Sequence, residues 1–119
     1  MRIVFLGTPE FAVPSLSALS EKYEVAGVVT QPDREKDRKG RLIKGAVALT
    51  AESKGLPVFQ FEKIKTEGAD ALRALHPDIM VTCAYGQILS KEILYGWKIY
   101  NLKKMFIFYC IILVLLEKA

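Results

Sequence analysis

The sequence has few of the residues that hold metal ions or build disulfide frameworks. It contains two cysteines and one histidine in 119 residues. Cys83 and Cys110 are far apart in the sequence, and His76 has no second histidine to join it, so neither a disulfide framework nor a metal site is expected. A reducing compartment is the default expectation, and we therefore expect a cytoplasmic protein.

Long apolar runs are also lacking. The run at 3–6 is much shorter than the core of a signal peptide, and Gly-Thr-Pro follows it directly. The longest run, 105–116, has twelve apolar residues, whereas a bilayer-spanning helix needs about 20. A secretory leader and a membrane span are therefore not predicted. An anchor formed by 105–116 stays open as an alternative.

The net charge of +4 is spread unevenly. Residues 33–45 carry six basic and three acidic side chains, and 95–119 carry four lysines and one glutamate. Clustered cations of this kind attract anionic partners. We interpret 33–45 as a basic arm for a polyanion; the alternative is a solvated connection between two elements.

Apolar strands and amphipathic helices alternate along the chain. Strands are expected at 2–6, 24–30, 57–59 and 78–84, and helices are expected after Thr8, at 46–54 and at 66–75. Thr8 is expected to cap the first helix, and Pro14 predicts that its regular part begins later or bends. The alternation predicts an α/β fold, a Rossmann-like doubly wound parallel sheet that is incomplete.

Ligands of such sheets bind outside the carboxyl ends of the strands. Here those ends lead into three polar or glycine-bearing loops, at 7–9, 31–45 and 85–87. We expect all three loops at one edge of the sheet. Gly7 alone is not a dinucleotide fingerprint, so no NAD or FAD is proposed.

Four segments carry a family resemblance. GTPEFAVPSL, GVVTQPDR, ESKGLPVFQ and PDIMVTCAYGQILSKEIL occur in this order within residues 1–94. They resemble the N-terminal part of the methionyl-tRNA formyltransferase family. The resemblance implies transfer of a formyl group from 10-formyltetrahydrofolate to the methionine of initiator tRNA in translation initiation. It implies folate and initiator methionyl-tRNA as partners, with no stable protein partner and no metal.

The resemblance also implies roles for the three loops. The folate-binding residues would be Tyr85, Gly86, Gln87, Ile88 and Leu89. The rim near the methionyl side chain would comprise Thr8, Pro9 and Phe11. The tRNA-binding loop would use Arg34, Arg38, Lys39, Arg41 and Lys44. The alternatives are an ordinary strand-to-helix turn at 85–89 and a core position for Phe11.

The reacting groups of the family are not found. The resemblance implies an Asn-x-His pair and a later Asp for proton transfer and oxyanion stabilisation. Asn101 is followed two residues later by Lys103, and His76 precedes Pro77 at a helix end. Cys83 is interpreted as a buried small side chain. We expect no catalytic residue in this chain and no formyl transfer by it alone.

Residues 95–119 differ in composition from 1–94. This stretch has no Asp, Pro, Ser, Thr, Gln or Arg. An out-of-frame readthrough is favoured, and a paralogue with a hydrophobic appendage is the alternative. The fourth strand would then keep an open edge unless 105–116 covers it. Three functions follow: a truncated formyltransferase, a folate- or RNA-end-binding module without catalysis, or a Rossmann-like domain with a membrane-associating tail.

Overall fold

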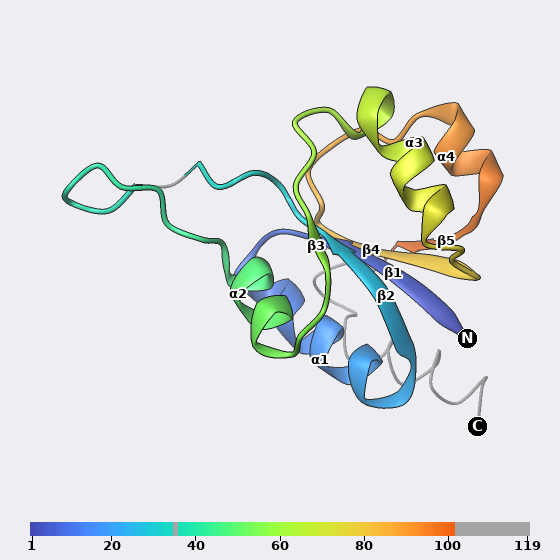
Figure 1. The fold of residues 1–119 in the computed structure, drawn as a ribbon, viewed down its shortest axis with the longest axis horizontal. Helices are drawn as coiled ribbons and strands as arrows, with labels where there is room; N and C mark the ends of the chain where they lie inside the picture. Colours follow the sequence, from blue (N-terminus) through green and yellow to red (C-terminus); the bar gives the residue numbers. More distant parts are fainter. Residues whose placement is uncertain (35, 102–119) are drawn as a thin grey trace.

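The computed structural model describes residues 1–34 and 36–101, which form a five-stranded parallel sheet between two layers of helices (Figure 1). Its strands are β1 Arg2–Gly7, β2 Glu24–Val29, β3 Val58–Phe59, β4 Ile79–Cys83 and β5 Lys98–Asn101. Its helices are the 3-10 turn η1 Glu10–Ala12, α1 Val13–Lys22, α2 Ala46–Ser53, α3 Ile64–Ala74 and α4 Lys91–Gly96. The expectations for Cys110 and for 105–116 lie outside the described residues.

The order of the strands confirms the doubly wound fold. The order is β3-β2-β1-β4-β5, with every pair parallel. The chain runs outward from β1 to β3 and then returns to the other side of β1 to form β4 and β5. The reversal between β1 and β4 is the topological switch point, where ligands of such sheets bind.

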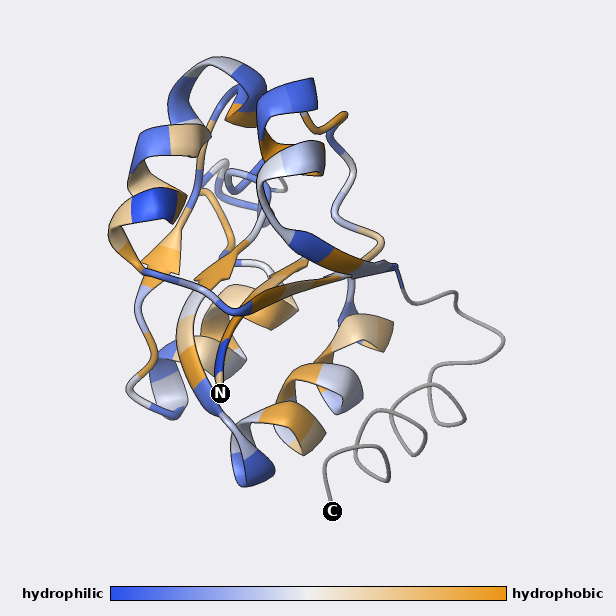
Figure 2. Cartoon of the chain, turned by 90° about the vertical axis from the view of Figure 1, so that its right-hand side faces the viewer, coloured by the Kyte–Doolittle hydropathy of each residue, from blue (hydrophilic) through white to orange (hydrophobic). Residues whose placement is uncertain are grey.

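Strand β1 is buried on both faces. Ile3 and Phe5 pack with α1 and α2, whereas Val4 and Leu6 pack with α3 and α4. All four side chains are fully buried, and each such burial contributes about 1.5–3 kcal/mol. Figure 2 shows the hydrophobic strands running between the two helix layers. This packing fixes β1, and with it the loop that follows β1.

The start of the first helix differs from the prediction at Thr8. The 3-10 turn is preceded by Pro9 and has no side-chain cap, and α1 begins at Val13. Thr8 does not cap the helix because its hydroxyl group donates to the carbonyl of Tyr85 at 2.8 Å. The later start predicted from Pro14 is confirmed, since Pro14 lies in the first turn of α1.

Regular structure continues past residue 94. Ser90 caps α4 by accepting a hydrogen bond from the Ile93 amide at 3.3 Å. Strand β5 follows and pairs with β4 from Lys98 to Asn101. The expectation of an open edge on the fourth strand is therefore wrong, because β5 occupies it. Among the described residues, no helix is long and apolar enough to cross a membrane.

Candidate functional site

The loops that follow β1, β2 and β4 meet at one edge of the sheet, as expected. The Thr8 hydroxyl donates to the Tyr85 carbonyl at 2.8 Å and accepts from the Gln31 amide at 3.3 Å. Thr8 follows β1, Gln31 follows β2 and Tyr85 follows β4. One hydroxyl group thus joins three segments directly at the switch point.

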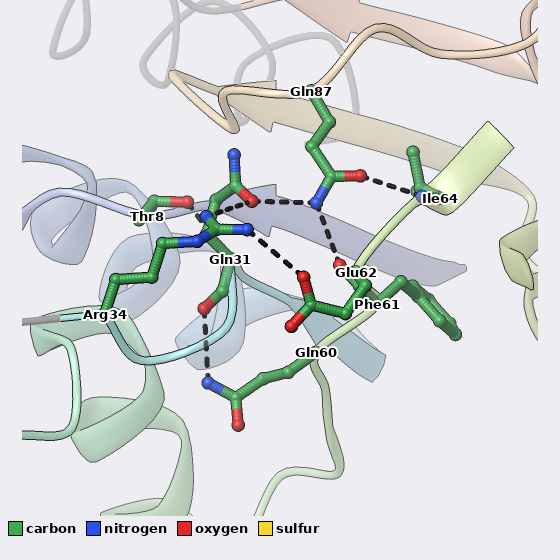
Figure 3. A network of polar contacts seen from close by, with 8 residues as sticks. All are labelled: Thr8, Gln31, Arg34, Gln60, Phe61, Glu62, Ile64 and Gln87. Carbon is green, nitrogen blue, oxygen red and sulfur yellow. Dashed lines mark hydrogen bonds and ion pairs between the residues drawn. The ribbon is translucent and has the colours of Figure 1, made fainter. Parts of the chain in front are cut away.

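The side chain of Gln87 makes a second set of contacts at this edge (Figure 3). Its Nε2 donates to Oε1 of Gln31 and to the carbonyl of Phe61, both at 2.8 Å. Its Oε1 accepts from the amide of Ile64 at 2.8 Å, which satisfies an unpaired amide at the start of α3. Every polar atom of this amide is engaged within the protein, so Gln87 fixes the loop and its side chain is not available to a ligand.

The turn after β4 is tight. Ala84 and Gly86 have positive φ angles of 53° and 94°, a backbone conformation that costs about 1–2 kcal/mol for a residue with a side chain. On the other side of the switch point, a Cβ on Gly7 would lie 2.9 Å from the Cys83 carbonyl. β1 and β4 can approach this closely only because position 7 is glycine.

A cavity of about 320 Å³ lies beside the 85–89 loop. Its walls include Ile88, Leu89 and Leu94, and Thr82 and Asn101 add polar groups. The Ile88 side chain is 85% exposed. The cavity is mostly apolar with a few polar groups, and this volume is within the range of small-molecule sites, about 300–1,000 Å³.

The side chain of Tyr85 is buried in the core rather than exposed to a ligand. Its ring is 4% exposed and packs with the core on the α3 side of the sheet. Burial raises the pKa of the Tyr85 hydroxyl to about 12, and among the described residues the hydroxyl has no hydrogen-bond partner. Only the backbone of Tyr85 is therefore placed to contact a ligand in the cavity.

A second cavity, of about 490 Å³, lies between the loop after β1 and both ends of the charged loop. Thr8 and Pro9 line it, together with Arg34 and Lys44. Phe11 is not among the lining residues, and its half-buried ring packs against the core beside α1. Two of the three predicted rim residues thus face this cavity.

The charged loop projects away from the sheet (Figure 1). Its tip is held by Asp37, whose carboxylate accepts from the amides of Lys39 and Arg41 at 2.9 and 3.0 Å and pairs with the Arg41 guanidinium at 3.0 Å. The hydrogen bond from the Arg41 amide is the main reason that the pKa of the Asp37 carboxyl is lowered. The tip is therefore organised by the loop's own charges.

The base of the loop is closed by Asp33. Its Oδ1 accepts from the Gly45 amide at 3.3 Å and from Nε2 of Gln60 at 3.0 Å. Lys44 pairs with Glu52 at 2.6 Å. The predicted tRNA-binding cations thus fall into two groups, with Arg34 and Lys44 at the base and the others at the tip.

Within residues 1–34 and 36–101, Arg38 and Lys39 take part in no ion pair, whereas Arg34, Arg41 and Lys44 do. The three paired cations are each at least half exposed, and exposed ion pairs contribute only about 0–1 kcal/mol. All five cations can therefore turn toward an anion, and Arg38 and Lys39 need break no ion pair of the described residues to do so.

The remaining candidates lie away from the site or are buried. His76 is exposed at the opposite edge, where its amide donates to the Arg73 carbonyl at 3.1 Å at the end of α3. Cys83 is fully buried, as predicted, and burial raises the pKa of its thiol. No group of three or more metal-binding side chains gathers in the described part of the chain.

Sequence reasoning missed two polar residues of the site. In the sequence, Gln31 belongs to a charged loop, and Asn101 lacks the histidine of an Asn-x-His pair because position 103 is lysine. Asn101 accepts from the Thr82 hydroxyl at 3.0 Å beside the 320 Å³ cavity. The available signal was positional, since each residue stands at or just past the carboxyl end of a strand.

The fold and site define a doubly wound α/β domain with two cavities at the carboxyl ends of its strands. The family described as "Formyl transferase" matches residues 1–103. The chain belongs to this family, and the match extends beyond residue 94, where the recognisable motifs end.

Among relatives, the methionyl-tRNA formyltransferase of Bacillus subtilis (strain 168) is 55% identical over 95 residues, which cover 78% of this chain and 30% of that protein. That of Bacillus pumilus (strain SAFR-032) is 54% identical with the same coverage. The chain thus spans less than a third of the length of these relatives.

A solved structure shares the fold. Glycinamide ribonucleotide transformylase 1 from Symbiobacterium toebii has a TM-score of 0.64 at 17% identity, covering 85% of this chain and 50% of that one.

Proposed function

We propose that this domain is the part of a methionyl-tRNA formyltransferase that contributes the folate-facing and tRNA-facing loops, in a cytoplasmic protein. The observation that carries the proposal is the cavity beside the 85–89 loop, which lies at the carboxyl ends of β4 and β5 in a formyl transferase domain. The names of the relatives supply the tRNA part of the proposal.

The chemistry of the cavity suits the pterin of 10-formyltetrahydrofolate. A planar heterocycle needs apolar walls and a few fixed polar groups. Ile88 and Leu89 offer the walls, and Gly86 is exposed and lines the cavity. Gln87 contributes by holding this backbone in place, as its side chain is bonded elsewhere.

The charged loop suits the phosphates of a tRNA acceptor end. Arg38 and Lys39 extend from the tip, and Arg34 and Lys44 stand beside the 490 Å³ cavity near Thr8 and Pro9. Cations along such a path neutralise successive phosphates, with an affinity that falls as salt rises. The cavity would take the end of the acceptor strand and the methionyl group.

Formyl transfer itself requires a base for the amine proton and donors for the developing oxyanion. The 119 residues contain no Asn-x-His, and the one histidine lies at the far edge of the sheet. We propose that this chain alone binds without catalysis, and that formyltransferase-like sequence gives way to unrelated sequence after residue 103. A nucleotide sequence that encodes Asn-x-His in another frame nearby would establish the readthrough.

Titration calorimetry of the 119-residue chain with 5-formyltetrahydrofolate tests the folate site. Saturable binding is expected, and Ile88→Asp should weaken it at least about tenfold, since a charge replaces an apolar wall. Leu49→Asp is the matched control, because Leu49 is 52% exposed on α2 and lines neither cavity. Absence of binding, or equal effects of the two variants, would contradict the assignment.

A further inference from the structure

We infer that Gln31 is a positioning residue that couples ligand binding at the 85–89 loop to anion binding at the charged loop. The inference rests on the proposed function, because it concerns the two sites named there. Gln31 lies where β2 passes into the charged loop, and its side chain points toward Gln87 rather than outward (Figure 3).

One oxygen atom of Gln31 holds both loops. Its Oε1 accepts from Nη1 of Arg34 at 3.0 Å and from Nε2 of Gln87 at 2.8 Å. A second connection runs through the backbone. The backbone amide of Gln31 donates to the Thr8 hydroxyl, and this hydroxyl donates to the Tyr85 carbonyl. The two loops are therefore joined by two sets of hydrogen bonds, one through the side chain of Gln31 and one through its backbone.

The side-chain amide of Gln31 also fills the space beside Gly86. A Cβ placed on Gly86 would lie only 2.8 Å from Nε2 of Gln31. Because the side chain packs this closely, a displacement of Gln31 alters the space available to the 85–89 loop. Gln87 is anchored to Phe61 and Ile64, so Gln31 is the adjustable partner of the pair.

The Arg34 side of this network is open to an anion. The Arg34 side chain is 58% exposed, and its pair with Glu62 is long at 3.5 Å. A phosphate held by Arg34 would restrict the motion of the Arg34 side chain. Because Arg34 donates to Oε1 of Gln31, the side-chain amide of Gln31 would be restricted as well. Part of the entropy cost of ordering the 85–89 loop would then be met before the second ligand binds, which gives positive coupling. Coupling is reciprocal, so each ligand tightens the other by the same factor.

The test measures the affinity of the 119-residue chain for 5-formyltetrahydrofolate with and without a saturating RNA minihelix that has a single-stranded 3′ end. The reverse titration is also made. In the unmodified chain each ligand is expected to lower the dissociation constant of the other about fivefold, at the lower end of measured couplings. In Gln31→Met the factor should fall below about twofold, with both ligands still binding.

Two further variants separate coupling from general damage. Gln31→Glu keeps acceptor oxygens for Arg34 and Gln87 and should retain the coupling. Gln60→Met is the matched control, because the Gln60 amide contacts the Gln31 carbonyl and Asp33 but not the 85–89 loop; it should also retain the coupling. Full coupling in Gln31→Met, or its loss in Gln60→Met, would overturn the inference.

An error in the proposed function can be distinguished from an error in the role of Gln31. If neither ligand binds the unmodified chain, the assignment of the two sites is wrong, and the link is then judged without ligands. Arg34→Met removes the bond to Gln31 and the long ion pair with Glu62, and it should speed amide hydrogen exchange at 86–89 by about threefold or more, because the loop opens more often. Unchanged exchange at these amides would refute the link.

Discussion

The two edges of the parallel sheet are built in different ways. At the edge where the strands begin, the Arg2 guanidinium donates twice to the Leu75 carbonyl, at 3.0 and 2.7 Å, and pairs with Glu24 at 2.9 Å. The Arg2 backbone exchanges hydrogen bonds with Asp78. At the edge where the strands end, uncharged amides and hydroxyls join the loops after β1, β2 and β4, and Asp33 and Arg34 add charged partners. Both cavities lie at this edge.

The difference separates stability from binding. Charged groups at the first edge satisfy the end of α3 and fasten it to β1. At the second edge the polar groups fix the loops but leave apolar walls uncovered. Substitutions at the first edge should therefore lower stability, and substitutions at the second should lower affinity. The following predictions test this separation.

Gly7→Val should produce the largest loss of stability. Its Cβ would lie 2.9 Å from the Cys83 carbonyl, a backbone atom that cannot move aside without shifting β4. We expect a loss of about 2–3 kcal/mol in urea unfolding, as for overpacked cores. Gly96→Val is the control, because a Cβ at Gly96 meets nothing within 4 Å. Equal losses in both variants would show that β1 and β4 are not in close contact at the switch point.

Arg2→Met should lower stability and leave ligand binding unchanged. Removing the guanidinium leaves the Leu75 carbonyl without two donors, and hydrogen bonds from charged groups contribute about 1.5–3 kcal/mol. We expect a loss of about 2 kcal/mol in urea unfolding. Glu24→Gln breaks only the exposed ion pair and should cost less than about 0.5 kcal/mol. A change in folate affinity in Arg2→Met, measured well below its unfolding midpoint, would contradict the separation.

Gly86→Ala should lower ligand affinity as well as stability. The positive φ angle costs about 1 kcal/mol for alanine, and the new Cβ would press on Gln31 at 2.8 Å. We expect affinity for 5-formyltetrahydrofolate to fall at least about tenfold, a loss of 1.4 kcal/mol in binding. Gly55→Ala has the same backbone strain, with φ 71° and open space around it. It should lose similar stability and keep its affinity.

The double variant Arg38→Ala with Lys39→Ala tests the charged loop. Each lost phosphate contact lowers the slope of log affinity against log salt by about 0.7–0.9. RNA titrations at several salt concentrations should therefore show a slope smaller by about 1.5. Lys54→Ala with Lys65→Ala removes two exposed lysines outside the charged loop, one just after α2 and one in α3, and should leave the slope unchanged. Identical slopes in both double variants would remove the loop tip from the interface.

Acid should loosen the loop tip while the sheet stays folded. The pKa of Asp37 is lowered by hydrogen bonding to the Arg41 amide. This contact therefore stabilises the loop tip at pH values above 3.8, the pKa of Asp37 in the unfolded chain, and the stabilisation is lost as the pH falls through the lower pKa of the folded chain. Amide chemical shifts of Lys39 and Arg41 should move together with an apparent pKa below 3.8. Asp37→Asn should remove this titration. Shifts with a midpoint above 3.8 would contradict the contact.

The strands and the edge that they share were predictable from sequence. Continuous apolar runs such as 24–30 and 78–84 can be buried only in a sheet that is covered on both faces, and the strands formed within those bounds. The loops after them then had to meet. β5 was missed because the unusual composition of 95–119 obscured a short strand at Lys98–Asn101.

The internal contacts of the site were not predictable. The Gln31–Gln87 bond joins residues 56 positions apart, and no local pattern pairs two neutral amides. Thr8 likewise looked like a helix cap, since that role is common before Pro-Glu. Its partner, the Tyr85 carbonyl, comes close only after β1 and β4 pair. Sequence periodicity reports which face is buried, whereas polar loop contacts depend on the finished sheet.

The most direct measurement is a map of backbone amide chemical shifts of the 119-residue chain during titration with 5-formyltetrahydrofolate. The account predicts the largest changes at 86–89 and at Thr8, with none at Arg2 or Asp78. Changes centred on the Arg2 edge, or spread evenly over the sheet, would contradict a ligand site at the carboxyl ends of the strands.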